Sequence, residues 1–224
     1  MAGLGFKTFN AASVLTAADL QGYAVDQSVM VFATAAARTS ALTSPSQGMM
    51  SFLNDSGTTW IYYAAYNAST NPGGAASAGW YPAPGSAMFF GQAQRSAVTG
   101  TTYTAGSTGF LYTEYVDGLN WHSTVTNTSR ITPTVRGLYQ MMTQTSFSSI
   151  AAGSRVARIA VNGSSISGST QSTTVPGSPY PSTTLVYFLN GSTDYVEFLN
   201  YQDSGGSVTV TQQVSVTFLR PIIF

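Results

Sequence analysis

His122 is the only histidine in this 224-residue chain, so any serine–histidine–acid triad would have to include it. It follows Trp121 in a segment with the composition of a strand, and the chain contains no Gly-x-Ser-x-Gly nucleophile elbow. A metal site built from several imidazoles is excluded by the same count. We therefore interpret His122 as a structural or surface histidine.

Two pairs of neighbouring acids are the remaining candidates for catalysis, because cleavage of a glycosidic bond uses two carboxylates that flank it. They are Glu114 with Asp117, and Asp194 with Glu197. Side chains three residues apart on a strand point to opposite faces, and each pair lies at a predicted strand end or turn. The spacing argues against catalysis, so we expect no catalytic residues and no enzymatic activity. A glycan-active enzyme remains the least favoured of three hypotheses.

Metal, phosphate and nucleic-acid sites have little support in the sequence. The chain has no cysteine, and the loop at Asp203 offers one carboxylate where calcium takes about six to eight oxygen ligands. Lys7 is the only lysine, which excludes a phosphate-binding loop of the Gly-rich, lysine-containing kind. Eight basic and eight acidic residues give zero formal net charge, so no basic surface for nucleic acid is expected. We expect neither a metal nor a cofactor.

Aromatic residues near hydroxyl-rich segments are the best candidates for ligand contact. Thr99–Thr108 and Gly163–Pro181 are rich in Ser and Thr, and they carry Tyr103 and Tyr180. Exposed aromatic rings on loops stack on sugars or fill a partner's pocket, so we take both tyrosines, together with Trp121, as candidate ligand-binding residues. The same loops could equally be inert and solvated. A second aromatic cluster is interpreted mainly as core or subunit packing: Tyr62, Tyr63, Tyr66, Trp80 and Tyr81.

The composition indicates a folded protein with an unusually uncharged surface. Hydrophobic residues make up 43%, but charged residues make up only 7%, against about 25% in ordinary soluble domains. The missing charge is replaced by 29 Ser and 30 Thr. No stretch approaches the ~18 consecutive apolar residues of a membrane-spanning helix. A neutral surface resists association poorly, which favours a place in an assembly.

Residues 1–70 are predicted to form an N-terminal module with one short helix and a β-hairpin, for which a resemblance given below implies a role in attachment and oligomerisation. Thr16 and Asp19 have the spacing of a helix N-terminal capping box. A strand is favoured at Ser28–Ala33, and Gly48–Leu53 with Thr59–Tyr66 reads as a β-hairpin. Six apolar residues of this module are predicted assembly contacts: Phe6, Phe9, Leu15, Leu20, Val29 and Phe32.

Residues 71–85 are rich in Pro, Gly and Ala, and we predict a linker there with neither helix nor sheet. Residues 86–224 are predicted to form an antiparallel jelly-roll sandwich, because short Val-, Tyr-, Phe- and Thr-rich runs recur about every ten residues. The predicted strands are Ala87–Gln94, Gly109–Val116, His122–Asn127, Gly137–Phe147, Arg155–Val161, Thr183–Leu189, Tyr195–Gln202 and Val208–Leu219. The last alternates most regularly, with Val and Phe on one face and Thr, Gln and Ser on the other.

An ordered series of segments in this region resembles the jelly roll of the tumour-necrosis-factor and complement-head family. The segments are RITPTVRGLYQMMTQTSF (Arg130–Phe147), ARIAVNG (Ala157–Gly163), TTLVYFLNGSTDYVEFLNYQDSGG (Thr183–Gly206) and VSVTFLR (Val214–Arg220). The family's usual Gly-Asp pair is loosened here to Gly191-Ser-Thr-Asp194, so the turn before Tyr195 is expected to differ. The resemblance implies a trimer.

The N-terminal part resembles a different group, the opening module of virion proteins from tailed phages of actinobacteria. The matching segments are Val14–Leu20 and Met30–Arg38. This resemblance implies a virion structural protein, assembled in the host cytoplasm among other virion proteins. The first hypothesis is a trimeric minor tail protein whose head contacts host-surface glycan. The second is a trimeric capsid decoration or head-fibre protein bound to the shell through its N-terminal module.

Overall fold

The computed structural model describes residues 14, 16–23, 28–98, 102–104, 112–148, 153–173 and 180–222. The chain is mainly β and divides into two compact units. The N-terminal unit comprises Met1–Ser86 and Arg220–Phe224, and the head unit comprises Ala87–Leu219. No helix in the described part of the chain has the length and apolar character needed to cross a membrane.

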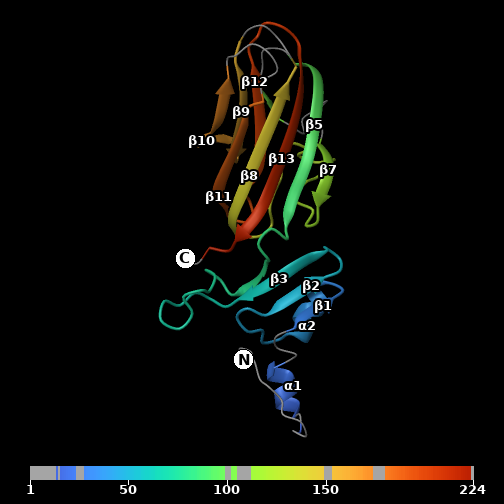
Figure 1. Ribbon diagram of the computed structural model, residues 1–224, viewed down its shortest axis with the longest axis vertical. Helices are drawn as coiled ribbons and strands as arrows, with labels where there is room; N and C mark the ends of the chain where they lie inside the picture. The colour runs from blue at the N-terminus through green and yellow to red at the C-terminus, as the bar shows by residue number, and fades with distance from the viewer. Residues whose placement is uncertain are drawn as a thin grey trace. The chain divides into compact units, whose positions relative to one another are not determined.

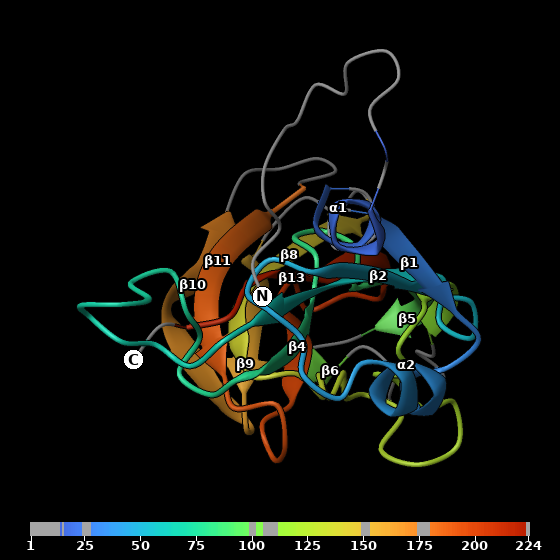
Figure 2. The same ribbon diagram turned by 90° about the horizontal axis from the view of Figure 1, so that it is seen from below.

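The N-terminal unit is built on a four-stranded sheet with the order β1-β2-β3-β4. β1 pairs parallel to β2, whereas β2–β3 and β3–β4 are antiparallel. A short helix precedes this sheet, and a second helix follows β1 and packs beside it (Figure 2). The bounds are α1 Ala17–Tyr23, β1 Val29–Phe32, α2 Ala35–Ala41, β2 Met50–Leu53, β3 Thr58–Tyr63 and β4 Gly79–Pro82.

Local capping explains both helices. The predicted capping box is confirmed: the Asp19 amide donates to Thr16 Oγ1 at 3.0 Å, and the Thr16 amide donates to Asp19 Oδ2 at 3.3 Å. Thr34 caps α2 in the same manner, its hydroxyl accepting from the Ala37 amide at 3.1 Å. The run Val29–Ala37 is ambiguous between strand and helix from its residues, and its β-branched start favours a strand, so a separate helix at α2 was not predicted. That strand is also present, as β1.

The predicted hairpin is confirmed as β2 and β3, with Gly57 at a φ of 62° in the turn that joins them. The expectation that residues 71–85 contain no sheet is wrong for Gly79–Pro82, which form β4 at the sheet edge. An edge strand tolerates Pro and Gly because only one side of it joins the ladder. Here Trp80 pairs with Tyr62, and Tyr81 pairs with Ile61.

The head unit contains two antiparallel sheets (Figure 1). The five-stranded sheet has the order β11-β8-β13-β5-β7, and the four-stranded sheet has the order β10-β9-β12-β6. The bounds are β5 Met88–Val98, β6 Thr102–Thr104, β7 Tyr112–Asp117, β8 Gly137–Phe147, β9 Arg155–Val161, β10 Ser164–Thr173, β11 Ser182–Leu189, β12 Val196–Gln202 and β13 Val208–Arg220.

The path of the chain confirms a jelly roll. From β8 the chain crosses to β9, forms the β9–β10 hairpin, crosses back to β11, then to β12, and finally to β13. Sequential strands therefore lie mostly in opposite sheets, which is the double Greek-key connection of a jelly roll. The hairpin turn is Asn162-Gly163, with φ values of 53° and 77°.

The core lies between the two sheets and follows the predicted alternation. Along β13, Val214, Val216 and Phe218 are fully buried, while Gln213 on the other face is exposed. Gln212 shares the buried face and connects the sheets: its Oε1 accepts from Asn200 Nδ2 at 3.1 Å and its Nε2 donates to Thr143 Oγ1 at 2.9 Å. These two hydrogen bonds engage both polar atoms of the buried Gln212 amide, whereas the buried Oδ1 of Asn200 has no donor among the described residues.

Three local predictions in the head are wrong. Residues 122–127 form turns rather than a strand, apart from an isolated bridge between His122 and Ile131. Ser164–Thr173, expected to be loop, form β10, and Thr102–Thr104 form β6. β10 is polar because it is an edge strand held mainly by its ladder to β9, which shifts register between Ser165 and Thr170.

Candidate ligand pocket in the head unit

A pocket of about 270 Å³ opens in the segment between β7 and β8. We call it the 120–134 pocket. Its size is close to the lower end of ordinary ligand sites, about 300 Å³. Trp121, His122 and Arg130 contribute to its lining. The other lining residues carry hydroxyl or amide groups: Asn120, Ser123, Thr126, Asn127, Thr132 and Thr134.

Asp117, the last residue of β7, fixes the start of this segment. Its two carboxylate oxygens accept from the backbone amides of Trp121 at 2.8 Å and His122 at 2.9 Å. Burial raises the pKa of Asp117, and the two amide hydrogen bonds oppose that shift. The Thr132 amide then donates to the Trp121 carbonyl at 2.6 Å, which closes the segment on itself.

His122 fills the base of the segment, with a side chain that is only 1% exposed. Its Nε2 lies 2.9 Å from the Thr128 carbonyl, which can only accept, so Nε2 carries a proton. Its Nδ1 is in hydrogen-bond contact with Oε1 of Glu114. The ring also packs against Phe89 and Tyr112, at centroid distances of 5.3 and 5.1 Å. Both ring nitrogens are engaged, so neither is free to take a proton from a nucleophile.

Two residues of the pocket adopt the left-handed backbone conformation. Asn120 has a φ of 53° and Asn127 a φ of 51°. Asparagine tolerates this region better than other non-glycine residues. These two turns, together with the Ser123 hydroxyl that accepts from the Thr126 amide at 3.0 Å, explain why 122–127 cannot continue as a strand.

The charges at the rim of the pocket neutralise one another. Arg130 Nε lies 3.8 Å from Glu197 Oε1, and its guanidinium carbon stacks 3.9 Å from the centroid of the Tyr195 ring. Glu197 also accepts from the Ser129 hydroxyl at 2.7 Å. The pocket is therefore a neutral surface of donors and acceptors, suited to a polar, uncharged ligand rather than to an ion.

Trp121, a predicted ligand-binding residue, lies in the core at 2% exposure and contacts Tyr139 edge to face at 5.6 Å. It belongs to the pocket lining, and its indole N–H has no acceptor among the described residues. The buried ring is positioned to support the pocket wall rather than to stack on a ligand in solvent.

Tyr180, the second predicted ligand residue, is 61% exposed. It borders a smaller hollow of about 120 Å³ together with Gln144, Ser146, Thr211 and Gln213. An accessible ring beside amides and hydroxyls is compatible with a sugar. Tyr103 lies on β6, where its backbone pairs with that of Asn200.

The four acids considered for catalysis have structural partners. Glu114 pairs with His122, and Asp117 holds two backbone amides. Asp194 accepts from the Asn190 amide at 2.8 Å and from Asn162 Nδ2 at 2.8 Å, and Glu197 lies beside Arg130. Within the described residues, no three His, Cys, Asp or Glu side chains are grouped so as to hold a metal ion.

The predicted assembly contacts divide into two groups. Phe6, Phe9 and Leu15 lie outside the described residues. Leu20 on α1 is 48% exposed and Val29 on β1 is 52% exposed, whereas Phe32 is half-buried.

Sequence reasoning treated His122 and the acids separately and missed the pocket that they support. The Ser, Thr and Asn residues of WHSTVTNTSR were a usable signal, because such clusters mark turns. No signal indicated the pairing of Glu114 with His122, since it depends on the turn that Asp117 creates.

Comparison with known proteins shows no family for this chain. No family model and no curated protein matches the chain. Among solved structures, the PRD1 vertex protein P5 is similar at 14% identity and a TM-score of 0.41, covering 59% of this chain and 97% of that one. The globular domain of zebrafish complement 1qA protein is similar at 14% identity and a TM-score of 0.39, and the match covers 56% of this chain and 95% of that domain. Eiger TNF from S. frugiperda is similar at 13% identity and a TM-score of 0.36, and the match covers 59% of this chain and 94% of that one.

Proposed function

We propose that this protein is a non-enzymatic structural protein of a tailed-phage virion, a homotrimeric minor tail protein whose head contacts a glycan on the host surface. The observation that carries the contact role is the 120–134 pocket, with its neutral lining of hydroxyl and amide residues. Sugar hydroxyls both donate and accept hydrogen bonds, which this lining can match. The virion role is supported by the resemblance of Val14–Leu20 and Met30–Arg38 to phage virion proteins.

The location of this protein on the virion distinguishes the proposed tail protein from the alternative, a capsid decoration or head-fibre protein. Gold-labelled antibody against the head unit, applied to intact virions, is expected to mark the tail and leave the capsid unlabelled. Label restricted to capsids would replace the tail assignment by the alternative, and absence of label from every virion would contradict both.

The outer face of the five-stranded sheet supports the homotrimer. Several of its apolar side chains are exposed, including Val186 at 52%, Met142 at 41% and Val116 at 42%. Tyr115, 55% exposed, packs against Phe90 on the same face at 5.4 Å between ring centroids. An apolar face of this kind is stabilised when a closed oligomer covers it.

The mass in solution tests this assembly. We expect sedimentation equilibrium to give about 70 kDa, three times the 23.5 kDa chain. Val186→Asp should shift the protein to single chains, because it places a charge in the contact. Val125→Asp is the matched control, since Val125 is 87% exposed outside that sheet. A native chain that sediments as a monomer contradicts the proposal.

The glycan contact is tested by removing pocket hydroxyls without altering side-chain shape. We expect the double variant Thr126→Val, Thr134→Val to bind cell-wall polysaccharide from an actinobacterial host roughly thirtyfold more weakly, since each of the two lost hydrogen bonds is worth about 1 kcal/mol. Both threonines are exposed and border the pocket. Isothermal titration calorimetry gives the affinity.

The control carries the same two chemical changes elsewhere. Thr113→Val with Thr170→Val alters exposed positions on β7 and β10 and should bind as the native chain does. Equal losses in both double variants, or no binding by the native protein, would remove the pocket from the proposal.

A further inference from the structure

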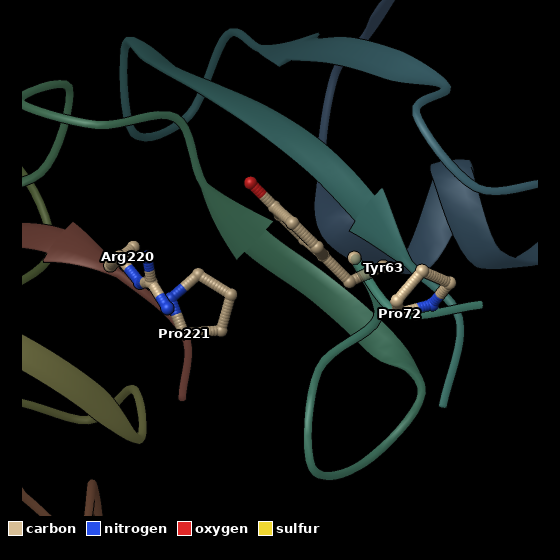
Figure 3. Close-up of a pocket in the computed structure, with 5 residues that line it drawn as sticks. Tyr63, Pro72, Arg220 and Pro221 are labelled. Carbon is tan, nitrogen blue, oxygen red and sulfur yellow. The ribbon is translucent and has the colours of Figure 1, made fainter. Parts of the chain in front are cut away.

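The N-terminal unit contains a second pocket, of about 250 Å³, that the proposed function does not use. It is lined by Tyr63, Pro72 and Gly73, and by Arg220 and Pro221 from the end of the chain. Figure 3 shows Arg220 and Pro221 on one side, and Tyr63 and Pro72 on the other. All five residues belong to the same compact unit.

Hydrogen bonds hold the first wall of this pocket in place. The loop that carries Pro72 is closed by the Tyr66 amide, which donates to the Ala75 carbonyl at 2.7 Å. Asn71 Nδ2 donates to the Ala65 carbonyl at 3.0 Å inside that loop. The Tyr63 ring rests edge-on against Tyr81, at 5.7 Å between centroids. This wall is therefore formed before any ligand arrives.

The second wall is attached by the backbone. The Ala76 amide donates to the Ile222 carbonyl at 2.8 Å, which fixes the segment that follows Arg220. Pro221 restricts the same segment further, because its ring fixes φ. Two segments far apart in the sequence thus form one preorganised pocket.

Arg220 is an exposed cation that has no ion pair among the described residues. The two acids described in this unit are engaged elsewhere: Asp19 at the cap of α1, and Asp55 in the charge interaction with Arg38. The guanidinium is therefore available to an external carboxylate, which it can bind with two parallel hydrogen bonds.

We propose that this pocket binds a carboxylate-bearing, proline-containing segment of another polypeptide. A ring such as Tyr63 flanked by proline surfaces matches an extended proline-rich chain, which loses little conformational entropy on binding. Arg220 selects an acidic residue beside the proline. The site stands apart from the glycan contact in the head unit, so either can fail without the other.

The lining favours a peptide over an acidic sugar. Recognition of a sugar ring requires several directed hydrogen bonds, as the 120–134 pocket offers. Among the described residues that line the present pocket, only Tyr63 and Arg220 carry a polar side-chain group. Prolines and an aromatic ring provide the remaining surface. The volume accommodates one or two residues, so contact at this pocket alone is weak and gains strength by avidity in an assembly.

The test uses the full-length, ¹⁵N-labelled protein and two capped peptides, Ac-PPDPP-NH₂ and Ac-PPNPP-NH₂. We expect amide shifts at Gly73 and a Kd for the aspartate peptide about fivefold below that of the asparagine peptide, the usual size of one partly exposed ion pair. Arg220→Gln should bring the two affinities together. Pro72→Ala should weaken both peptides equally, because it removes apolar contact and no charge.

Arg136→Gln is the matched control, since it removes one exposed arginine charge from the head unit and should leave the preference for aspartate intact. The proposal is overturned if the native chain binds both peptides equally or neither, or if Arg136→Gln abolishes the preference as Arg220→Gln does. Glucuronate that shifts the same amides with equal affinity would also overturn it, in favour of an acidic sugar.

Discussion

Gly191→Ala is expected to lower the free energy of unfolding of the head unit by about 3 kcal/mol or more. Gly191 has a φ of 72°, in the left-handed region that disfavours side chains. A Cβ built there would lie 2.3 Å from the Arg136 backbone nitrogen and 2.4 Å from the Val135 carbonyl carbon. Backbone atoms cannot rotate away, so the turn or the start of β8 would have to move.

The turn has little freedom to relax. The Asn190 side-chain oxygen accepts from the amides of Ser192 at 2.9 Å, Thr193 at 2.9 Å and Asp194 at 3.1 Å. This network holds Gly191 against residues 135 and 136. Because the turn leads from β11 in one sheet to β12 in the other, a displacement there would disturb both layers.

Urea unfolding followed by fluorescence measures the loss, and Gly205→Ala supplies the control. Gly205 also has a left-handed φ, 75°, but a Cβ there would meet no atom within 4 Å. Gly205→Ala should lower the free energy of unfolding by about 1 kcal/mol, the cost of holding an alanine in the left-handed backbone conformation. Equal losses for the two variants would show that Val135 and Arg136 do not confine this turn.

Arg38→Ala is expected to destabilise the N-terminal unit by about 3 kcal/mol, because it empties the position that joins α2 to the sheet. Arg38 is 5% exposed, and its guanidinium carbon lies 4.4 Å from the Trp80 ring centroid and 5.1 Å from that of Trp60. Its Nη1 donates to Ser51 Oγ at 3.3 Å. Burial lowers the pKa of Arg38, and the negative charge of Asp55 opposes that shift.

Two further variants separate packing from charge. Arg38→Met keeps a long apolar stem without burying a charge, so we expect it to recover part of the loss. Arg38→Lys should recover less, because an ammonium cannot stack as a planar group between two indoles. Thermal unfolding monitored by tryptophan fluorescence provides the measurement. A loss below about 1 kcal/mol for Arg38→Ala would mean that the indoles pack as well without the cation.

The regular part of the head could be predicted because its signals are local. Strict alternation defined β13, and the dipeptide Asn162-Gly163 is typical of the turn that follows β9. Strand runs at Gly137–Phe147 and Arg155–Val161 match β8 and β9 residue for residue. In each case the period of burial and the turn chemistry agree with the tertiary structure.

The remaining features depend on contacts between distant segments. β10 is a strand because β9 supplies its hydrogen bonds, although its own residues are those of a loop. The 120–134 pocket exists because Asp117 turns the chain and Glu114 receives His122. Arg38 carries a charge that predicts exposure, yet two indoles from different strands enclose it. Such arrangements have no signature at a fixed sequence spacing.

The return of Arg220–Phe224 to the N-terminal unit means that the chain passes between the two units twice, once at Ser86–Ala87 and once at Leu219–Arg220. A cut at Leu219–Arg220 would leave the head covalently joined through Ser86–Ala87. A cut at Ser86–Ala87 would leave it held by non-covalent contacts of the C-terminal segment, among them the hydrogen bond from the Ala76 amide to the Ile222 carbonyl.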